Sequence, residues 1–275
     1  MLTYTTYSEA GGVGKTTLSA NLARAHVDNG LDVLVIDFDP QDGSLSYLLG
    51  VEDGRDDEKA DTLVHHLIDR PKGEFEDLIR TTEGIDVLPS HNILERLGDL
   101  LSDAASIAEQ TGESFSKYGR LRHVLAKNNV PDQYDVLIVD PPATSGPHLY
   151  NAIDTTRSLV IPVELSGKGD QSISGLESVS AGIEDTLGIT VGVLAVVPNR
   201  YEGLNDQDAV LNEVSDLGYD VPVTLRKRSS LFEGCWRKQC TAYRYIDEHR
   251  ERKRDHELET LVKIDELADH LEDRA

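Results

Sequence analysis

Short apolar runs alternate along the chain with longer segments in which apolar residues recur every three or four positions. The short runs are rich in β-branched residues and end at Gly, Pro or Asp, which is typical of strands covered on both faces. This pattern predicts strands at Leu2–Tyr7, Asp32–Asp37, Ile85–Pro89, Tyr134–Asp140, Ser158–Val163 and Thr190–Val197, and a shorter strand near Val221–Leu225.

The longer segments predict amphipathic helices between these strands. In the first of them, Leu18, Leu22 and Ala25 recur at helical spacing, and Gly30 is expected to close the helix. Helices are predicted at Lys15–Asn29, Thr62–Arg70, Ile93–Gln110, Lys117–Asn128, Ser174–Leu187, Asp206–Leu217 and His256–Leu271.

The regular alternation of strand and helix predicts an α/β fold, with a doubly wound, mostly parallel β-sheet flanked by helices. No internal repeat, low-complexity tract or proline-rich linker marks a boundary within the 275 residues. We therefore expect residues 1–275 to form a single domain.

The stretch SEAGGVGKTT, residues 8–17, joins the first strand to the first helix. Gly11, Gly12 and Gly14 allow backbone amides to turn toward an anion without interference from a Cβ atom. The N-terminus of the following helix adds the positive end of its dipole. The stretch is therefore a candidate phosphate-binding loop.

Two side chains after the glycines support this interpretation. Lys15 can neutralise phosphate oxygens, and Thr16 can place its hydroxyl on Mg²⁺. The strict pattern G-x-x-x-x-G-K-[ST] is not met, because Glu9 stands where its first glycine should be. In the alternative interpretation, the glycines only make a tight turn between strand and helix.

Two later segments each place an aspartate at the carboxyl end of a buried strand, where open α/β sheets bind their ligands. Asp39 lies in IDFDPQDGS, residues 36–44, and Asp140 lies in VLIVDPPATSG, residues 136–146. Asp140 has the position of a Walker-B carboxylate that reaches Mg²⁺ through water. Asp39 could hold the attacking water or a metal-bound water. An isolated aspartate at a strand end is more often a turn or cap residue, but here three phosphate-site elements follow in order.

The segments GGVGKTT, DFDPQDG and VDPPA, with VVPNR at 196–200, resemble the ParA/MinD group of deviant-Walker-A P-loop ATPases. The resemblance covers most of the chain and is closest to the ParA branch of Soj-like chromosome and plasmid partition proteins, through DPQ at 39–41. It implies ATP and Mg²⁺ as cofactors, with Lys15, Asp39 and Asp140 in catalysis and Thr16, Asp39 and Asp140 around the metal. It also implies that Asn199 contacts adenine. The expected nucleotide-binding set is Gly11, Gly12, Val13, Gly14, Lys15, Thr16, Thr17, Asn199 and Arg200.

Ala10 departs from the pattern of this family. The residue before the first glycine of its GGxGK[ST] motif is normally a lysine that reaches across an ATP-bound dimer and neutralises charge in the partner's nucleotide. Alanine carries no charge, and Glu9 adds charge of the wrong sign. A cation supplied in trans is worth about 10³ to 10⁵ in rate where it acts as a finger. Slow hydrolysis is therefore expected unless Lys168 or Arg200 substitutes; the alternative for Lys168 is a solvated turn residue.

The composition adds an unusual acidic excess. Fifty Asp and Glu against 27 Lys and Arg give a net charge of −23 and a pI near 4.6. This excess would suit a halophile, whose salt screens the self-repulsion. The two cysteines are too few for a disulfide framework or a closed zinc site. The N-terminal MLTYTTY has neither a charged leader nor an apolar one, so a cytoplasmic protein is expected.

The basic segment, residues 226–254, has the opposite charge. It holds ten Lys or Arg and four acids, a net charge of +6 within a chain that otherwise carries −29. ParA-branch proteins bind DNA non-specifically through late basic residues, and such phosphate contacts need only a cluster of cations. Arg250, Lys253 and Arg254 of HRERKRD are the candidate DNA-binding residues, expected on one side of a helix. Alternatively, these cations pair with acids of the chain or dock an acidic partner.

The resemblance further implies a homodimer in the ATP-bound state, a ParB-like stimulating or adaptor protein, and association with the nucleoid. A MinD-like membrane role would need a basic amphipathic tail, whereas the C-terminal ETLVKIDELADHLEDRA has an acidic polar face. No membrane partner is therefore expected.

Two functional hypotheses follow. The first is a partition-type ATPase that acts as a nucleotide switch in DNA segregation or intracellular positioning. The second is an ATP-binding regulatory module with little hydrolysis that binds a protein partner, which Ala10 favours. A metabolic P-loop enzyme would need an acceptor pocket, and no group of residues in the sequence indicates one.

Overall fold

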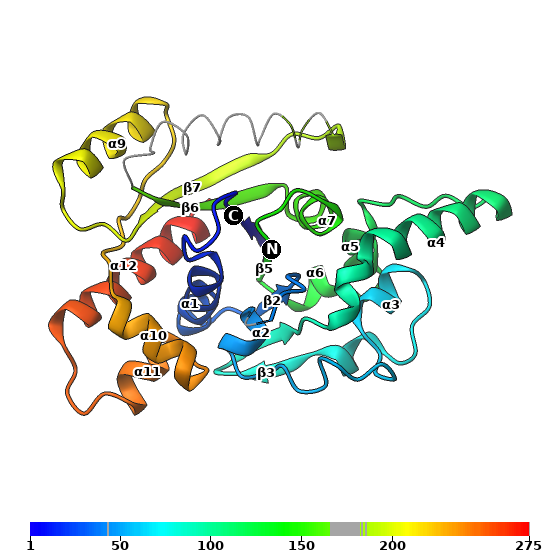
Figure 1. Ribbon diagram of the computed structural model, residues 1–275, viewed down its shortest axis with the longest axis horizontal. Helices are drawn as coiled ribbons and strands as arrows, with labels where there is room; N and C mark the ends of the chain where they lie inside the picture. Colours follow the sequence, from blue (N-terminus) through cyan, green and yellow to red (C-terminus); the bar gives the residue numbers. More distant parts are fainter. Residues whose placement is uncertain (43, 166–181, 183, 185, 275) are drawn as a thin grey trace.

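A seven-stranded sheet lies at the centre of the computed structural model, which describes residues 1–42, 44–165, 182, 184 and 186–274 (Figure 1). Its strand order is β3-β4-β2-β5-β1-β6-β7, and only the β3–β4 pair among these strands is antiparallel. The strands are β1 (Leu2–Thr6), β2 (Val33–Asp37), β3 (Arg80–Thr82), β4 (Ile85–Leu88), β5 (Val136–Asp140), β6 (Ser158–Glu164) and β7 (Gly192–Asn199).

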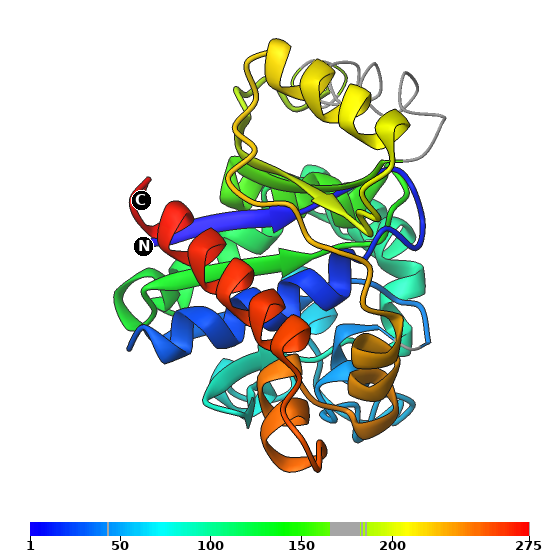
Figure 2. The same cartoon turned by 90° about the vertical axis from the view of Figure 1, so that its left-hand side faces the viewer.

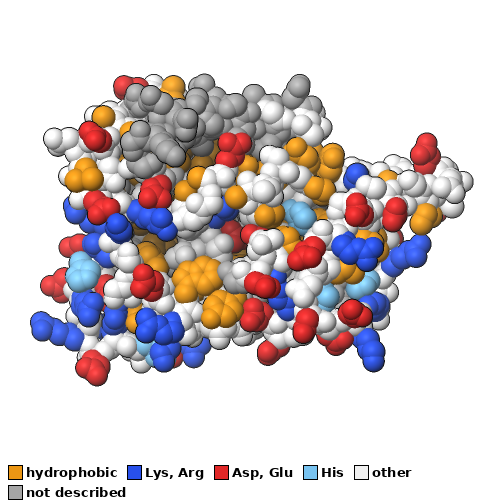
Figure 3. All heavy atoms as spheres, viewed as in Figure 1, with side chains coloured by type: hydrophobic (Ala, Val, Ile, Leu, Met, Phe, Trp, Pro, Cys, Tyr) orange, Lys and Arg blue, Asp and Glu red, His pale blue; other side chains and the backbone are white. Residues whose placement is uncertain are grey.

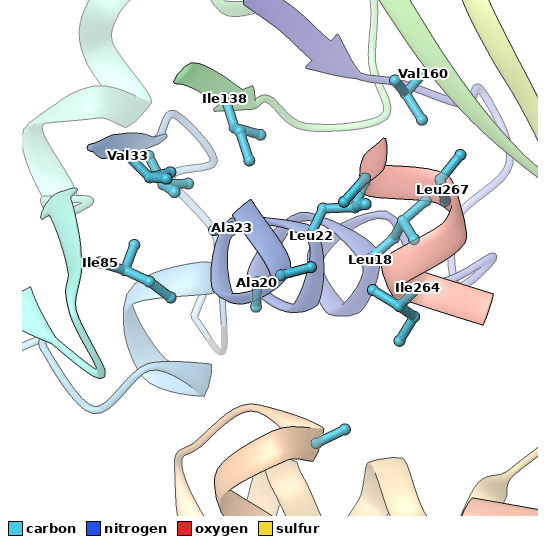
Figure 4. Close-up of a cluster of buried hydrophobic side chains, with 14 of the residues drawn as sticks. Leu18, Ala20, Leu22, Ala23, Val33, Ile85, Ile138, Val160, Ile264 and Leu267 are labelled. Carbon is cyan, nitrogen blue, oxygen red and sulfur yellow. The ribbon is translucent and has the colours of Figure 1, made fainter. Parts of the chain in front are cut away.

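The alternation of side chains along each strand divides the core into two sides of the sheet. In β2, Val33 and Val35 point into one core, while Leu34 and Ile36 point into the other. Figure 4 shows Val33, Ile138 and Val160 of three strands facing α1, with Ile264 and Leu267 of α12 packed beside it. Every residue of β2 and β5 is buried, as expected of central parallel strands.

Helices cover both faces of the sheet. Helices α1, α2, α10, α11 and α12 pack on one face, and α3 to α7 and α9 pack on the other. Figure 2 shows α12 crossing beside α1 on the first face, far from α9. On the first face the helices are α1 (Lys15–Asp28), α2 (Leu45–Leu48), α10 (Ser229–Lys238), α11 (Ala242–Glu248) and α12 (Asp255–Glu272). On the second they are α3 (Leu63–Leu67), α4 (Leu97–Thr111), α5 (Arg120–Lys127), α6 (Val130–Gln133), α7 (Pro147–Thr156) and α9 (Asn205–Asp216), with 3₁₀ turns η1 (Phe75–Leu78) and η2 (Asn92–Arg96).

The doubly wound, mostly parallel fold predicted from the sequence is confirmed, and six predicted strands lie within two residues of their expected ends. The strand predicted near Val221–Leu225 is wrong: residues 221–225 form no strand, although the Leu225 amide donates a hydrogen bond to the Pro198 carbonyl of β7 and an isolated bridge joins Tyr201 and Arg226. The helix predicted at Thr62–Arg70 is only the short α3, and that at Ser174–Leu187 lies almost entirely outside the described residues. A single domain over residues 1–275 stays a prediction.

Candidate functional site

The glycine-rich loop connects β1 to α1 at the carboxyl edge of the sheet. Gly12 and Gly14 have φ values of 77° and 97°, which L side chains rarely adopt. A Cβ atom on Gly14 would lie 2.5 Å from the Nδ2 atom of Asn199. That same Nδ2 donates a hydrogen bond to the Val13 carbonyl oxygen at 2.8 Å. Asn199, at the end of β7, therefore fixes the loop from outside, and glycine is required at position 14.

Lys15 and Thr16 begin α1, directly after the loop. Burial lowers the pKa of Lys15, and the opposing charges of Asp140 and Asp39 counteract part of this effect. The Thr16 hydroxyl lies close enough to Asp140 to lower the pKa of its carboxyl, which counteracts part of the effect of burial. The lysine and both predicted aspartates thus lie in one electrostatic environment, although they come from three separate segments.

Two buried carboxyls lie side by side on the central strands. Asp37 and Asp140 are register partners in β2 and β5, and each is 1% exposed. Burial raises the pKa of Asp140 to about 7, with a further contribution from the charge of Asp37. Burial also raises the pKa of Asp37 to about 6, although Ser44 and Ser46 donate hydrogen bonds to its Oδ2. Asp37 was not predicted as a site residue, because the first aspartate of DFD is equally compatible with the last residue of a buried strand.

One oxygen of Asp140 suits a metal-binding role. Ser19 Oγ donates to Asp140 Oδ1 at 3.1 Å, while Oδ2 is buried and has no hydrogen-bond partner among the described residues. A buried carboxylate oxygen beside the Thr16 hydroxyl fits the oxygen ligands that Mg²⁺ prefers. No cluster of three or more His, Cys, Asp or Glu that could hold a metal by itself occurs within the described ranges. This agrees with Mg²⁺ sites, which usually take one or two carboxylates together with phosphates and waters.

Asp39 lies in the loop that follows β2. Its Oδ1 accepts a hydrogen bond from the Gln41 amide at 2.9 Å, and its carbonyl accepts one from Ser90 Oγ at 2.6 Å. Arg55 holds the same loop: its Nη2 donates to the Pro40 carbonyl at 2.5 Å, and its Nε donates to Asn92 Oδ1 at 2.9 Å. Arg55 is 9% exposed, although charged residues surround it in the stretch EDGRDDEKAD, residues 52–61.

These residues surround two adjoining cavities. The first, of 580 Å³, is lined by the loop glycines, Lys15, Thr16 and Asp39. The second, of 390 Å³, lies between Asn199, Leu225 and helix α10. Residues that line both are Gly14, Thr17, Arg200 and Trp236. The predicted phosphate-side and adenine-side residues are thus brought together around connected space large enough for a nucleotide. Trp236 was missed because an aromatic in CWRKQC reads equally well as a core residue.

The region of the missing lysine offers one candidate cation. Ala10 and Glu9 are exposed, and Arg200 lines both cavities. Arg200 Nη1 lies 3.1 Å from Glu164 Oε2, so its charge is already paired in this structure. Lys168, the other candidate, lies outside the described residues.

The basic segment covers α10, α11 and the loop before α12, where Lys and Arg side chains gather on the left of Figure 3. The helix expected through HRERKRD is wrong, because α11 ends at Glu248 and α12 begins only at Asp255. Arg250 is largely buried: it pairs with Glu257 at 2.5 Å, and its guanidinium lies 4.8 Å from the Tyr245 ring centroid. Lys253 and Arg254 are exposed. Arg250 thus contributes to the structure, and only the other two predicted cations face solvent.

Comparison with known proteins agrees with this geometry. Residues 3–188 match a protein-family profile described as an AAA domain. The chain is 30% identical over 218 residues to the maintenance of carboxysome distribution protein A of Synechococcus elongatus, covering 78% of this chain and 79% of that protein. It is 29% identical over 201 residues to the chromosome-partitioning ATPase Soj of Thermus thermophilus, covering 71% and 68%. The match to two uncharacterised Mycobacterium tuberculosis proteins spans 65% of their length.

A solved structure with the same fold is the septum site-determining protein MinD of Pyrococcus horikoshii, complexed with Mg-ADP. It superposes with a TM-score of 0.69 at 20% identity, covering 97% of this chain and 94% of that one. The fold, the phosphate loop and these relatives define the class: the chain belongs to the ParA/MinD-type P-loop ATPases. None of the described helices is both long and apolar enough to cross a membrane.

Proposed function

We propose that this chain is a Mg²⁺-dependent ATPase of the partition type that acts as a nucleotide switch in DNA segregation or intracellular positioning. The observation that carries the proposal is that Lys15, Thr16 and Asp39 line one cavity at the carboxyl edge of the sheet, with the buried carboxyl of Asp140 close behind Lys15 and Thr16. The names of the relatives, a chromosome-partitioning ATPase and a carboxysome-distribution protein, support this class of role.

Each of these residues has a chemical task in such a site. The amides of the glycine loop and the Lys15 ammonium bind phosphate oxygens and neutralise their charge. Thr16 and Asp140 would hold Mg²⁺, which would supply charge stabilisation to the phosphates. Asp39, at the cavity wall, accepts a hydrogen bond from a water and orients it. Asn199 and Arg200 line the second cavity, which would hold the adenine.

The partition type further implies that two ATP-bound chains associate and that a ParB-like protein stimulates hydrolysis. Because Ala10 removes the cross-dimer lysine, we propose that intrinsic hydrolysis is slow. Release of Arg200 from Glu164, with which it is now paired at 3.1 Å, would free a cation at the cavity edge. Lys168 remains the second candidate for this role.

We also propose that the ATP-bound form binds DNA non-specifically through the basic segment and associates with the nucleoid in the cytoplasm. Because Arg250 stabilises the α11–α12 connection, the contacts would come from exposed cations such as Lys253 and Arg254. Reversing both to Glu should abolish ATP-dependent co-sedimentation with plasmid DNA, while Lys127→Glu at the end of α5 should not. Equal binding by both variants would contradict this assignment.

Equilibrium binding of labelled ATP tests the nucleotide site itself. We expect wild type to bind ATP in the presence of Mg²⁺ and Lys15→Ala to lose most of that affinity, whereas Lys127→Ala, an exposed lysine on α5, should bind normally. The assay should extend to multimolar KCl, because the net charge of −23 suits high salt. Absence of Lys15-dependent binding at every salt concentration would contradict the proposal.

The second candidate function is a regulatory module that binds ATP and a protein partner with little hydrolysis. Ala10 and Glu9 favour it, because neither supplies positive charge to a partner's nucleotide. The two candidates differ in one outcome: whether bound ATP is converted to ADP in a manner that depends on Asp39.

A further inference from the structure

Trp236 occupies an unusual place beside the nucleotide cavities. It is the only tryptophan in the chain and lies on α10, within the basic segment. Its side chain is half-buried and lines both cavities, together with Gly14, Thr17 and Arg200. Nothing in the phosphate-loop motif requires an aromatic residue here, so its role must be derived from its contacts.

The indole is fixed by neighbours from two other elements. Its Nε1 donates a hydrogen bond to Thr17 Oγ1 at 3.2 Å. Its ring stacks on Tyr47 of α2, with centroids 6.1 Å apart and planes 20° apart. Helix α10 in turn packs closely on α11, because Gly234 leaves room for the Tyr245 ring. The tryptophan thus connects the phosphate-loop helix with the basic segment.

The direction of the hydrogen bond has a chemical consequence. An indole N–H can only donate, whereas a threonine hydroxyl has one proton and two acceptor lone pairs. When Thr17 accepts from Trp236, one lone pair is occupied and the hydroxyl proton stays free to turn toward an acceptor in the cavity. Phosphate oxygens are strong acceptors, and hydrogen bonds to charged groups are shorter and stronger than neutral ones.

We propose that Trp236 is a positioning residue for the nucleotide: by donating to Thr17, it orients the Thr17 hydroxyl to donate to a phosphate oxygen. This inference rests on the proposed nucleotide binding. It also makes the indole a sensor, since a charge arriving one hydrogen bond away changes the surroundings of the Trp236 ring. The basic side chains of α10, Arg237 and Lys238, follow it directly in the chain.

A double-mutant cycle separates this role from simple packing. Trp236→Phe keeps an aromatic ring beside Tyr47 and removes the N–H donor, and Thr17→Val removes the hydroxyl. We expect each change to weaken binding of labelled ATP about two- to tenfold, the usual range for one hydrogen bond. The double variant should bind no more weakly than the weaker single variant. Thr111→Val, at an exposed hydroxyl on α4, is the control and should bind normally.

Additive losses in the double variant, or unchanged affinity in Trp236→Phe, would overturn the inference. The fluorescence emission of Trp236 gives a second measurement, which needs no substitution at this residue. Adding Mg²⁺ and ATP should change the fluorescence of wild type, and saturating ATP should change that of Thr17→Val much less. An unchanged emission in wild type that demonstrably binds ATP would also contradict the proposed role. Failure of wild type to bind ATP, in contrast, would contradict the proposed function itself.

Discussion

The two buried carboxyls, Asp37 and Asp140, show how single residues prepare this site. Their neighbouring positions on β2 and β5 follow from the parallel register, and burial raises the pKa of both. An ionised carboxylate that is buried beside a second carboxyl destabilises the folded state until a cation binds near it. We infer that these two carboxyls lower the stability of the folded chain when no metal ion is bound, and that they are suited to bind one.

The raised pKa of Asp140 makes stability depend on pH. The folded state binds a proton at Asp140 more tightly than the unfolded state does. This proton binding stabilises the folded state fully below about pH 4, and the stabilisation is lost as pH rises toward 7. Asp140→Asn removes this loss. Without metal or nucleotide, we expect this variant to melt at a higher temperature than wild type at pH 8, with a smaller difference at pH 5. A constant difference measured by differential scanning calorimetry at both pH values would contradict this explanation.

Gly14 provides a second test at the residue scale. Gly14→Ala would place a side chain at φ 97° and 2.5 Å from the Asn199 amide nitrogen, so we expect destabilisation of about 1 to 3 kcal/mol. Gly11→Ala is the matched control, because a Cβ atom there meets nothing within 4 Å. Chemical denaturation should show Gly11→Ala close to wild type in stability; equal losses in the two variants would rule out this strain argument.

At the scale of elements, the sequence predicted the strands and long helices well but missed short pieces held by tertiary contacts. The strands β2 and β5 and the helix α1 have clear periodic patterns. The helices α10 and α11 were missed because their charged residues obscure their apolar positions, such as Leu231, which only the core packing reveals.

The candidate site divides in the same way. Its loop, lysine and aspartates follow from local motifs; the loop, Lys15 and Asp39 line one cavity, and the charges of Asp39 and Asp140 both act on Lys15. Arg55 and Trp236 were not predicted, since each acts through a partner distant in sequence, such as Pro40 or Thr17. Spacing within the chain carries no signal for such contacts.

The α11–α12 connection gives a prediction at this scale. Arg250→Ala would leave Glu257, which is 1% exposed, without its main partner, and Arg254 at 3.7 Å compensates only in part. Removing one partner of a buried pair costs about 3 kcal/mol or more. Lys253→Ala breaks only an exposed pair with Asp247 and should cost less than about 1 kcal/mol. Urea denaturation compares the two, and equal stabilities would contradict a structural role for Arg250.

At the scale of the whole molecule, charge is divided between one basic surface and an otherwise acidic chain. The basic segment is joined to the nucleotide cavities by α10, whose Trp236 lines both. This arrangement would allow nucleotide occupancy to affect the surface that we propose for DNA. Position 10 also matters beyond the single chain, because a lysine there would act between two copies of the chain.

Restoring this lysine tests whether two chains cooperate. Ala10→Lys should accelerate phosphate release at least tenfold, and the rate per chain should rise with protein concentration as dimers form. Ala10→Gln, which has a similar length and no charge, is the control and should stay near the wild-type rate. An unchanged rate for Ala10→Lys, with ATP binding intact, would argue against hydrolysis coupled between two chains.

Phosphate release at saturating Mg²⁺ and ATP shows whether this site hydrolyses ATP with its own aspartates. We predict slow, measurable release by wild type and a loss of at least about tenfold in Asp39→Ala, with ATP affinity preserved. Asp42→Ala, a fully exposed aspartate in the same loop, should keep the wild-type rate. If wild type binds ATP tightly but releases phosphate no faster than Asp39→Ala, the chain is not an ATPase of this kind.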